Sequence, residues 1–262
     1  MDKNTPCLES CDMFDFMSKH VGLNVLHPGG LKSTDDLLEN LKINKSLNVL
    51  DIACGKGINS IMMAKKYGCQ VTGIDILEDS INQAVKYAKN NNVENLVTFK
   101  VADAHNLPFK DDEFDITIAQ AMLILAENKE KVIKEAKRVT KPNGKSGWLE
   151  LSWRNEVTDE FLEIANRELC GFCISNVKSF DKWIELFKST GYNDLKINKY
   201  SMEYRGLIGM VQDEGFTNGS KVMFKYMTNN KIRKRMKKLD RFFTKYSDYV
   251  GYGIYIGTNS YQ

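Results

Sequence analysis

The sequence predicts an α/β fold in which a mostly parallel β-sheet carries helices on both faces. Between residues 47 and 151, short runs rich in β-branched residues alternate with longer helical stretches, which is the pattern of a parallel sheet with helical crossovers. The first run leads directly into the glycine turn Cys54-Gly55-Lys56-Gly57. Two alternating, aromatic-rich runs at 195–200 and 249–257 extend the predicted sheet to seven strands.

The elements follow from hydrophobic periodicity and turn signals. Strands are expected at 47–52, 70–74, 97–101, 114–118, 147–151, 195–200 and 249–257, and helices at 59–67, 80–90, 129–139, 161–169 and 180–190. The tetrapeptide Lys141-Pro142-Asn143-Gly144 is expected to end the helix at 129–139 and to form a turn before the fifth strand. We predict one domain over 1–262, with an N-terminal helical cover (1–46), a ligand-binding core (47–152) and a second half (153–262) that carries a helical insertion at about 205–247 before the last strand.

Composition narrows the class of protein. The chain has 262 residues, of which 42% are hydrophobic and 27% charged, as in ordinary globular proteins. The N-terminus lacks a signal-peptide pattern, and the longest apolar run, 116–126, falls short of the ~20 residues of a membrane span. We therefore expect a cytoplasmic protein without a membrane span, in which the six cysteines are reduced.

The glycine turn excludes two common nucleotide-binding motifs. A P-loop requires Gly-x-x-x-x-Gly-Lys-Ser/Thr, which is absent, and Ser60 occupies the third glycine position of a dinucleotide fingerprint. Asp51 at the start of the turn would repel a pyrophosphate but would attract a ligand with a cationic amino-acid end. The sequence therefore disfavours the hypothesis of an NAD-dependent oxidoreductase.

Three carboxylates follow three neighbouring strands. Asp51 ends the first, Asp75 ends the second in a position suited to ribose hydroxyls, and Asp103 follows the third in a position suited to an adenine amino group. Carboxyl ends of parallel strands meet at one edge of a sheet. Together these acids predict a site for an adenosine linked to an amino acid.

With these motifs, the sequence resembles the class I S-adenosylmethionine-dependent methyltransferases, in particular their small-molecule branch of ubiquinone/menaquinone-type and phosphoethanolamine-type enzymes. The resemblance covers about residues 26–152. It rests on the segments 50–57, 73–75, 102–109, 114–115 and 138–144. It implies a Rossmann-like fold, S-adenosylmethionine as cofactor and S-adenosylhomocysteine as product.

The resemblance also implies roles for individual residues. Asp51, Ala53 and Gly55 would line the methionine end of the cofactor, Asp75 the ribose, Asp103 and Ala104 the adenine, and Gln120 the floor of the site; Leu26, His27, Cys54 and Ile76 would complete the cofactor site. The family usually has glycine at the position of Ala53. The turn Leu26-His27-Pro28-Gly29-Gly30 resembles a segment that closes over the cofactor in several relatives.

A general base is not evident. Some relatives carry a histidine after the fourth strand, where this chain has Leu125, and methyl transfer from a sulfonium needs mainly proximity and a dry pocket. His20, His27 and His105 are the remaining candidates, with His27 preferred because of its place beside the predicted cofactor site. For each of them a turn or surface histidine is the simpler explanation.

Other candidates are weaker. Cys170 and Cys173 have the spacing of soft metal ligands, but no second pair accompanies them, so we predict no metal site. Trp153 and Arg154 directly follow the fifth strand, where side chains face the ligand crevice. We keep both as candidate substrate contacts, with core packing as the alternative for the tryptophan.

The insertion is strongly basic. Residues 217–247 hold ten Lys or Arg and one acid, a net charge of +9, although the whole chain carries only +3. A solvated amphipathic helix over 221–245 is one interpretation, and an anionic surface or anionic substrate is the other, with nucleic acid unlikely. Candidate substrate-covering residues of this lid are Met210, Phe216, Met223, Tyr226 and Met227.

The sequence therefore predicts transfer of a methyl group from S-adenosylmethionine to a small-molecule acceptor. Two alternatives stay open: a noncatalytic S-adenosylmethionine sensor or scaffold, and a methyltransferase that acts on a lipid or macromolecule through the basic helix.

Overall fold

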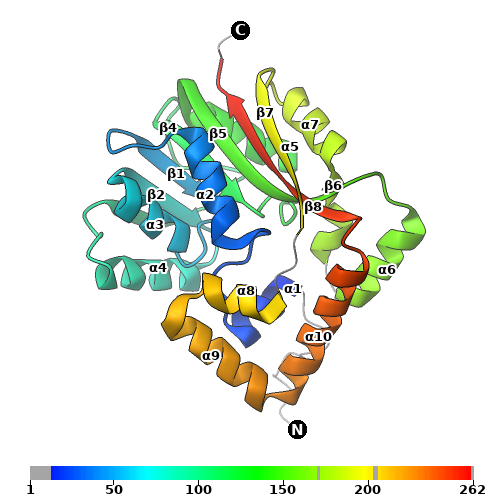
Figure 1. Cartoon of the computed structure of the whole chain (residues 1–262). Helices are drawn as coiled ribbons and strands as arrows, with labels where there is room; N and C mark the ends of the chain where they lie inside the picture. Colours follow the sequence, from blue (N-terminus) through cyan, green and yellow to red (C-terminus); the bar gives the residue numbers. More distant parts are fainter. Residues whose placement is uncertain (1–12, 170–171, 203–205, 261–262) are drawn as a thin grey trace.

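The computed structural model describes residues 13–169, 172–202 and 206–260, and its centre is one mixed β-sheet (Figure 1). The strand order is β3-β2-β1-β4-β5-β8-β7, with the two-residue strand β6 beside β5. The strands are β1 (Asn48–Ile52), β2 (Gln70–Asp75), β3 (Val97–Val101), β4 (Phe114–Gln120), β5 (Thr140–Trp153), β6 (Lys178–Ser179), β7 (Leu195–Ser201) and β8 (Val250–Thr258). Only β8 runs antiparallel to its neighbours β5 and β7. The predicted fold class is confirmed.

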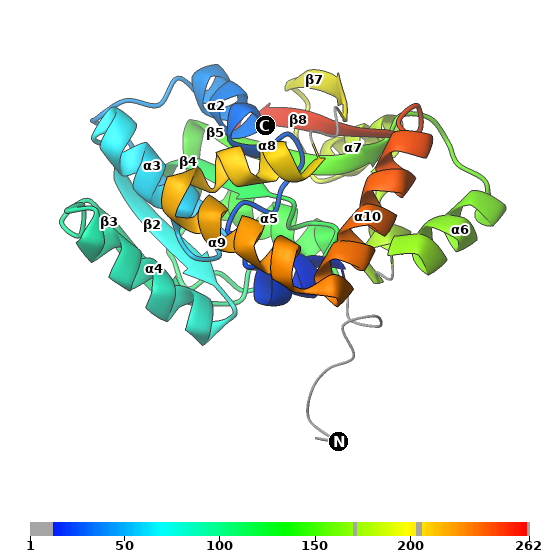
Figure 2. The same cartoon turned by 60° about the horizontal axis from the view of Figure 1, so that its bottom comes forward.

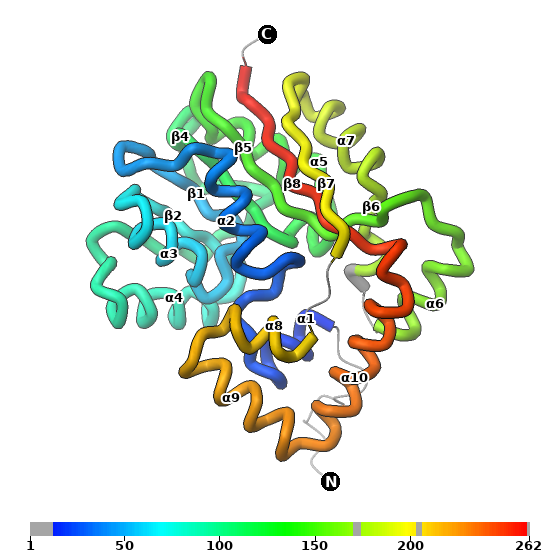
Figure 3. The backbone as a smooth tube through the Cα atoms, viewed as in Figure 1, coloured from blue at the N-terminus to red at the C-terminus, as the bar shows by residue number. Residues whose placement is uncertain are grey.

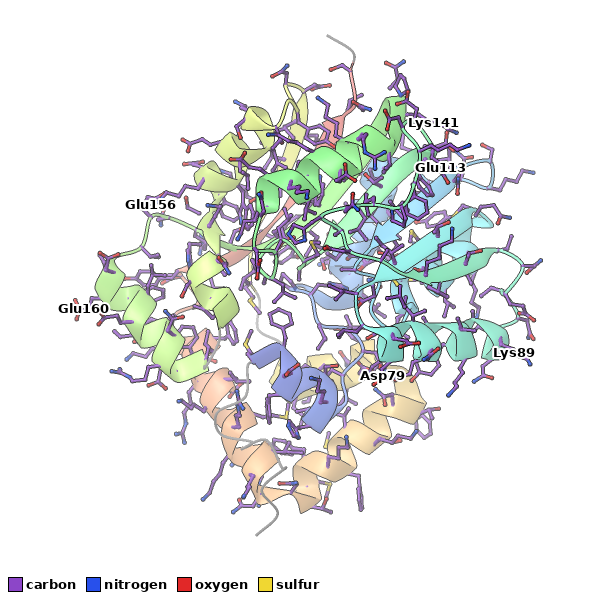
Figure 4. The ribbon with its side chains drawn as sticks, turned by 180° about the vertical axis from the view of Figure 1, so that it is seen from behind. Asp79, Lys89, Glu113, Lys141, Glu156 and Glu160 are labelled. Atoms are coloured by element: carbon purple, nitrogen blue, oxygen red, sulfur yellow. The ribbon has the colours of Figure 1, made fainter. Side chains whose placement is uncertain are left out.

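Helices cover both faces of the sheet. On one face lie α2 (Gly30–Leu41), α3 (Ile58–Tyr67) and α4 (Glu78–Asn90), and on the other lie α5 (Lys129–Val139) and α7 (Phe180–Ser189). Each face has its own apolar cluster, with Leu37 and Leu38 in one and Trp148 and Trp183 in the other. Asp79 and Lys89 lie near the two ends of α4 (Figure 4), where their charges complement the helix dipole.

The remaining helices gather below the sheet. They are α1 (Met13–Asp15), the π-helical turn η1 (Phe16–Val21), α6 (Asp159–Leu169), the 3-10 turn η2 (Phe172–Asn176), α8 (Gly206–Asp213), α9 (Gly215–Thr228) and α10 (Asn230–Lys245). In Figure 3 the blue N-terminal segment and the yellow-to-orange helices α8, α9 and α10 lie together beneath the strands. Within the described residues, the structure thus contains N-terminal helices and a helical insertion before the last strand, as predicted.

Strand β5 differs from the prediction. It begins at Thr140, which already pairs with Phe114, and the register shifts before Lys145 pairs with Ile116. The proline-glycine tetrapeptide therefore forms an irregularity inside the strand, with Asn143 at φ +62°, instead of a turn that precedes it. An extra stretch of residues in one strand is accommodated as a bulge, which local turn signals do not distinguish from a loop.

No helix in the described part of the chain is long and apolar enough to cross a membrane.

Candidate active site

The loop between β1 and α3 carries the glycine turn of the predicted site. Ala53, Gly55 and Gly57 all adopt positive φ angles, of 58°, 55° and 75°. A Cβ on Gly57 would lie 2.6 Å from the Phe99 ring, whereas a Cβ on Gly55 would meet nothing within 4 Å. The loop is thus packed against the fold at Gly57 and open at Gly55, so that a ligand has space to approach the backbone there.

Asp51 lies at the start of this loop. Its carboxylate is buried and accepts a hydrogen bond of 2.6 Å from the Ser60 hydroxyl on α3. Burial raises the pKa of Asp51 to about 7, because a charged carboxylate is disfavoured away from water. A cationic group brought beside it would favour the ionised form.

Asp75, at the end of β2, joins two neighbouring backbone segments. One carboxylate oxygen accepts the Gly55 N–H and the other accepts the Leu77 N–H, each at 2.9 Å. Ile76, the next residue, exposes 67% of its surface. The two oxygens of Asp75 suit the polar ribose of a nucleoside, and the exposed side chain of Ile76 suits its flat base.

Asp103 follows β3 and is half exposed. One of its oxygens accepts the backbone N–H of His105 and contacts His105 Nδ1, each at 2.8 Å. The His105 backbone bond is the main cause that lowers the pKa of Asp103. Ala104 beside it is buried. His105 is therefore bound to a predicted cofactor residue and does not line the cavity described below.

Gln120, His27 and Thr34 form a chain of polar contacts between the end of β4 and the N-terminal segment. The Thr34 hydroxyl donates to Gln120 Oε1 at 2.8 Å and lies 3.1 Å from His27 Nε2. Burial lowers the pKa of His27 to about 4, so its ring is neutral at pH 7. The Gln120 Nε2 group is buried without a hydrogen-bond partner, and such a donor is satisfied by a ligand oxygen.

A largely apolar cavity of about 140 Å³ adjoins this chain of contacts, and we call it the N-terminal cavity. Its walls come from the segment 13–30, from Ile124 in the loop after β4, from Leu151 on β5, and from Met202, α8 and Phe243. Of the predicted cofactor residues, Leu26 and His27 line it. Among the described residues, His27 and Asp213 are its titratable lining side chains. Because two predicted cofactor residues line it, the cavity lies directly beside the predicted cofactor site.

Most residues that were predicted to contact the substrate do not line the N-terminal cavity. Of the five lid candidates, only Met210 lines the cavity, while Met223 and Tyr226 are partly buried and Phe216 and Met227 are exposed. Trp153 is buried with its ring edge-on to that of Phe161. For this tryptophan the structure therefore agrees with the alternative of core packing. The backbone N–H of Arg154 bonds to the Tyr249 carbonyl. Neither Trp153 nor Arg154 lines the cavity.

The remaining sequence candidates add nothing to the site. The His20 ring lies beside Phe16, and His20 does not line the cavity. Cys170 and the side chain of Cys173 lie outside the described residues, within which no cluster of potential metal ligands is present.

Glu150 on β5 was missed by the sequence analysis. Its Oε1 accepts the backbone N–H groups of Met122 and Leu123 at 3.1 and 2.9 Å, while Oε2 is buried without a partner. Burial raises the pKa of Glu150 to about 8. The side chain thereby fixes the loop that follows β4. A lone acid within the apolar run 147–153 was the available signal.

Glu214 is a second residue that the sequence did not reveal. Its Oε1 accepts the backbone N–H groups of Asn24 and Val25, at 2.5 and 2.9 Å, and its Oε2 accepts the side-chain amides of Asn24 and Asn218. Lys225 adds a bond to the His20 carbonyl at 3.0 Å. These contacts tie α9 to the N-terminal segment that lines the cavity.

Comparisons with known proteins agree with this geometry. A family model described as a methyltransferase domain matches residues 43–191. The chain is 31% identical to an uncharacterized protein of Haemophilus influenzae, over 83% of this chain and 88% of that protein. It is 28% identical to the methyltransferase GfsG of Streptomyces halstedii, over 70% of this chain and 66% of that enzyme.

A solved structure shows the same fold. Phosphoethanolamine N-methyltransferase 2 of Haemonchus contortus, in complex with phosphomonomethylethanolamine and S-adenosylhomocysteine, matches with a TM-score of 0.73 at 17% identity. The match covers 98% of this chain and 61% of that chain.

The protein defined by this sheet and these strand-end carboxylates is a methyltransferase. More specifically, the chain belongs to the methyltransferase-domain family and is a class I S-adenosylmethionine-dependent enzyme, as its resemblance implied.

Proposed function

We propose that this methyltransferase methylates a small, mostly apolar molecule that binds in the N-terminal cavity. The observation that carries the proposal is the cavity itself: an apolar space of about 140 Å³ whose wall includes His27 and Leu26 of the predicted cofactor site. A cavity of about this size accommodates a single aromatic ring. The acceptor, or the part of it that is methylated, is therefore about one ring in size.

The residues of the loop and strand ends fit the cofactor. The open approach at Gly55 admits the ligand to the backbone, and the unpartnered Gln120 Nε2 is a donor for its carboxylate. The buried Asp51 would hold the ammonium group, which in turn favours the ionised carboxylate. Further along, Asp75 would accept the ribose hydroxyls, and Asp103 and Ala104 with the exposed Ile76 would hold the adenine; Ala53 and Cys54 complete the loop.

The cofactor supplies an electrophilic methyl group on a sulfonium sulfur, and the protein's part is to position the acceptor and exclude water. The apolar walls of the cavity provide the exclusion. His27, with its pKa lowered to about 4, is a poor proton acceptor at neutral pH. Its two ring nitrogens face the Ser33 and Thr34 hydroxyls, so its role is to form part of the cavity wall.

Filling the cavity tests this proposal. We expect Met210→Trp to reduce the release of S-adenosylhomocysteine at least tenfold when the low-mass fraction of a cell extract supplies the acceptor, because the larger side chain occupies the acceptor's place. Gln212→Trp is the matched control, since Gln212 is exposed on the same helix and does not line the cavity. Calorimetry should give both variants the wild-type cofactor affinity. Wild-type release by Met210→Trp would show that the acceptor binds elsewhere.

A further inference from the structure

Helix α9 exposes large apolar side chains to solvent. Phe216 is 95% exposed, Phe224 67% and Met227 66%. They are separated by eight and three residues, so they lie on one side of α9. Buried residues Gly219 and Val222 lie on its other side. Three such side chains together in solvent on one helix form an apolar patch of the kind that marks an interaction surface.

Exposed cations lie on the neighbouring helix α10. Lys234, Lys237 and Arg241 recur every three or four residues along α10 and so form a second row. With Lys221 and Lys231 they are exposed, and none forms an ion pair with a described residue. Lys221 lines a groove between α9 and α3. We call the other four cations, together with Phe216, Phe224 and Met227, the outer face of the hairpin. In Figure 2 both helices lie across the front of the molecule.

The hairpin is held rigidly. The Asn229 side chain accepts the backbone N–H groups of Lys231 and Ile232 and so begins α10, while Arg233 donates to the Met227 carbonyl at 2.8 Å at the end of α9. On the inner side, the Arg235 guanidinium lies 4.4 Å from the centre of the Phe16 ring. Arg233 and Arg235 thus contact the rest of the fold, whereas the cations of the outer face form no ion pair with a described residue.

We propose that the outer face of the hairpin binds the surface of an anionic lipid bilayer. Exposed Lys and Arg attract acidic headgroups, and phenylalanine and methionine side chains between them gain by entering the boundary of the acyl chains. A nucleic acid would attract the cations but would not account for the exposed apolar side chains. These side chains require a partner that has an apolar region next to its negative charges. The bilayer surface is the partner that offers both.

The inner side of α10 adjoins the N-terminal cavity, and so does the neighbouring helix α8. Met210 on α8 and Phe243 on α10 line that cavity, while the outer face lies on the opposite side of the hairpin. Docking therefore leaves the cavity wall intact, and binding to a bilayer is measurable without any knowledge of the methyl acceptor.

Vesicle flotation tests the proposal with the full chain. The protein is mixed with vesicles of phosphatidylcholine alone, or with vesicles in which about one lipid in four is phosphatidylglycerol. We expect the wild type to float with the anionic vesicles only. The triple variant Lys234→Glu, Lys237→Glu, Arg241→Glu and the double variant Phe216→Ser, Phe224→Ser should each lower the bound fraction at least tenfold.

A matched control lies on another helix. Lys86 and Lys89 are exposed on α4, and Figure 4 shows Lys89 at its end. Lys86→Glu with Lys89→Glu should leave flotation at the wild-type level, and an unchanged melting temperature shows that every variant is folded. Absence of flotation of the wild type would overturn the proposal. So would equal binding to neutral vesicles, full binding by the phenylalanine variant, or binding to an RNA oligonucleotide in place of vesicles.

Discussion

Asp75→Ala should weaken the binding of S-adenosylhomocysteine by about 100-fold, because a carboxylate that accepts several hydrogen bonds contributes about 3 kcal/mol and each 1.4 kcal/mol is tenfold in affinity. In the ligand-free fold the two oxygens already order the Gly55 and Leu77 N–H groups. The substitution therefore removes the proposed ribose acceptor and also loosens the loop. Isothermal titration calorimetry measures the effect directly.

Asp79→Ala is the control for this experiment. It removes the same charge four residues further on, from an exposed position in the first turn of α4 (Figure 4). We expect Asp79→Ala to bind the product with wild-type affinity. If Asp75→Ala also retained that affinity, Asp75 would have no part in cofactor binding, and the assignment of the strand-end carboxylates would have to be abandoned.

The two glycines of the first loop should respond differently to the same substitution. Both have positive φ angles, so an alanine at either position carries about 1 kcal/mol of backbone strain. At Gly57 the new Cβ also lies 2.6 Å from Phe99 and 2.8 Å from Ala84. Gly57→Ala should therefore lose about 3 kcal/mol of unfolding free energy in total.

At Gly55 the outcome should be the reverse. A Cβ there has open space in the ligand-free fold, so Gly55→Ala should lower the unfolding free energy by only about 1 kcal/mol. It should weaken cofactor binding at least tenfold, because the methyl group occupies the approach to the loop. Denaturant unfolding and calorimetry on both variants provide the comparison. Equal loss of stability at the two positions would contradict the packing of the loop.

The sequence predicted the sheet and the positions of Asp51, Asp75 and Asp103 because these features are local. An apolar run that ends in an acid before a glycine turn determines where a side chain stands on a parallel sheet. Gln120 was instead implied by the family resemblance, and β4 extends two residues beyond the predicted 114–118 to end at this residue.

Features that combine segments far apart along the chain could not be predicted from the sequence. The N-terminal cavity combines residues 13–30 with α8 and Phe243, and the Thr34–Gln120 bond joins residues 86 positions apart. Periodicity shows that a helix has an apolar side but not what covers it. Phe216 was therefore expected over the substrate, yet it is 95% exposed.

The most direct test of the proposed function follows the methyl group. The protein is incubated with S-adenosylmethionine labelled in its methyl group and with a cell extract, and the label is then counted in the lipid, small-molecule and acid-precipitable fractions. We expect label in the small-molecule fraction with the wild type and with Gln212→Trp, and its loss with Met210→Trp. Label in the precipitate would contradict a small acceptor, and cofactor binding without any transfer would favour a noncatalytic sensor.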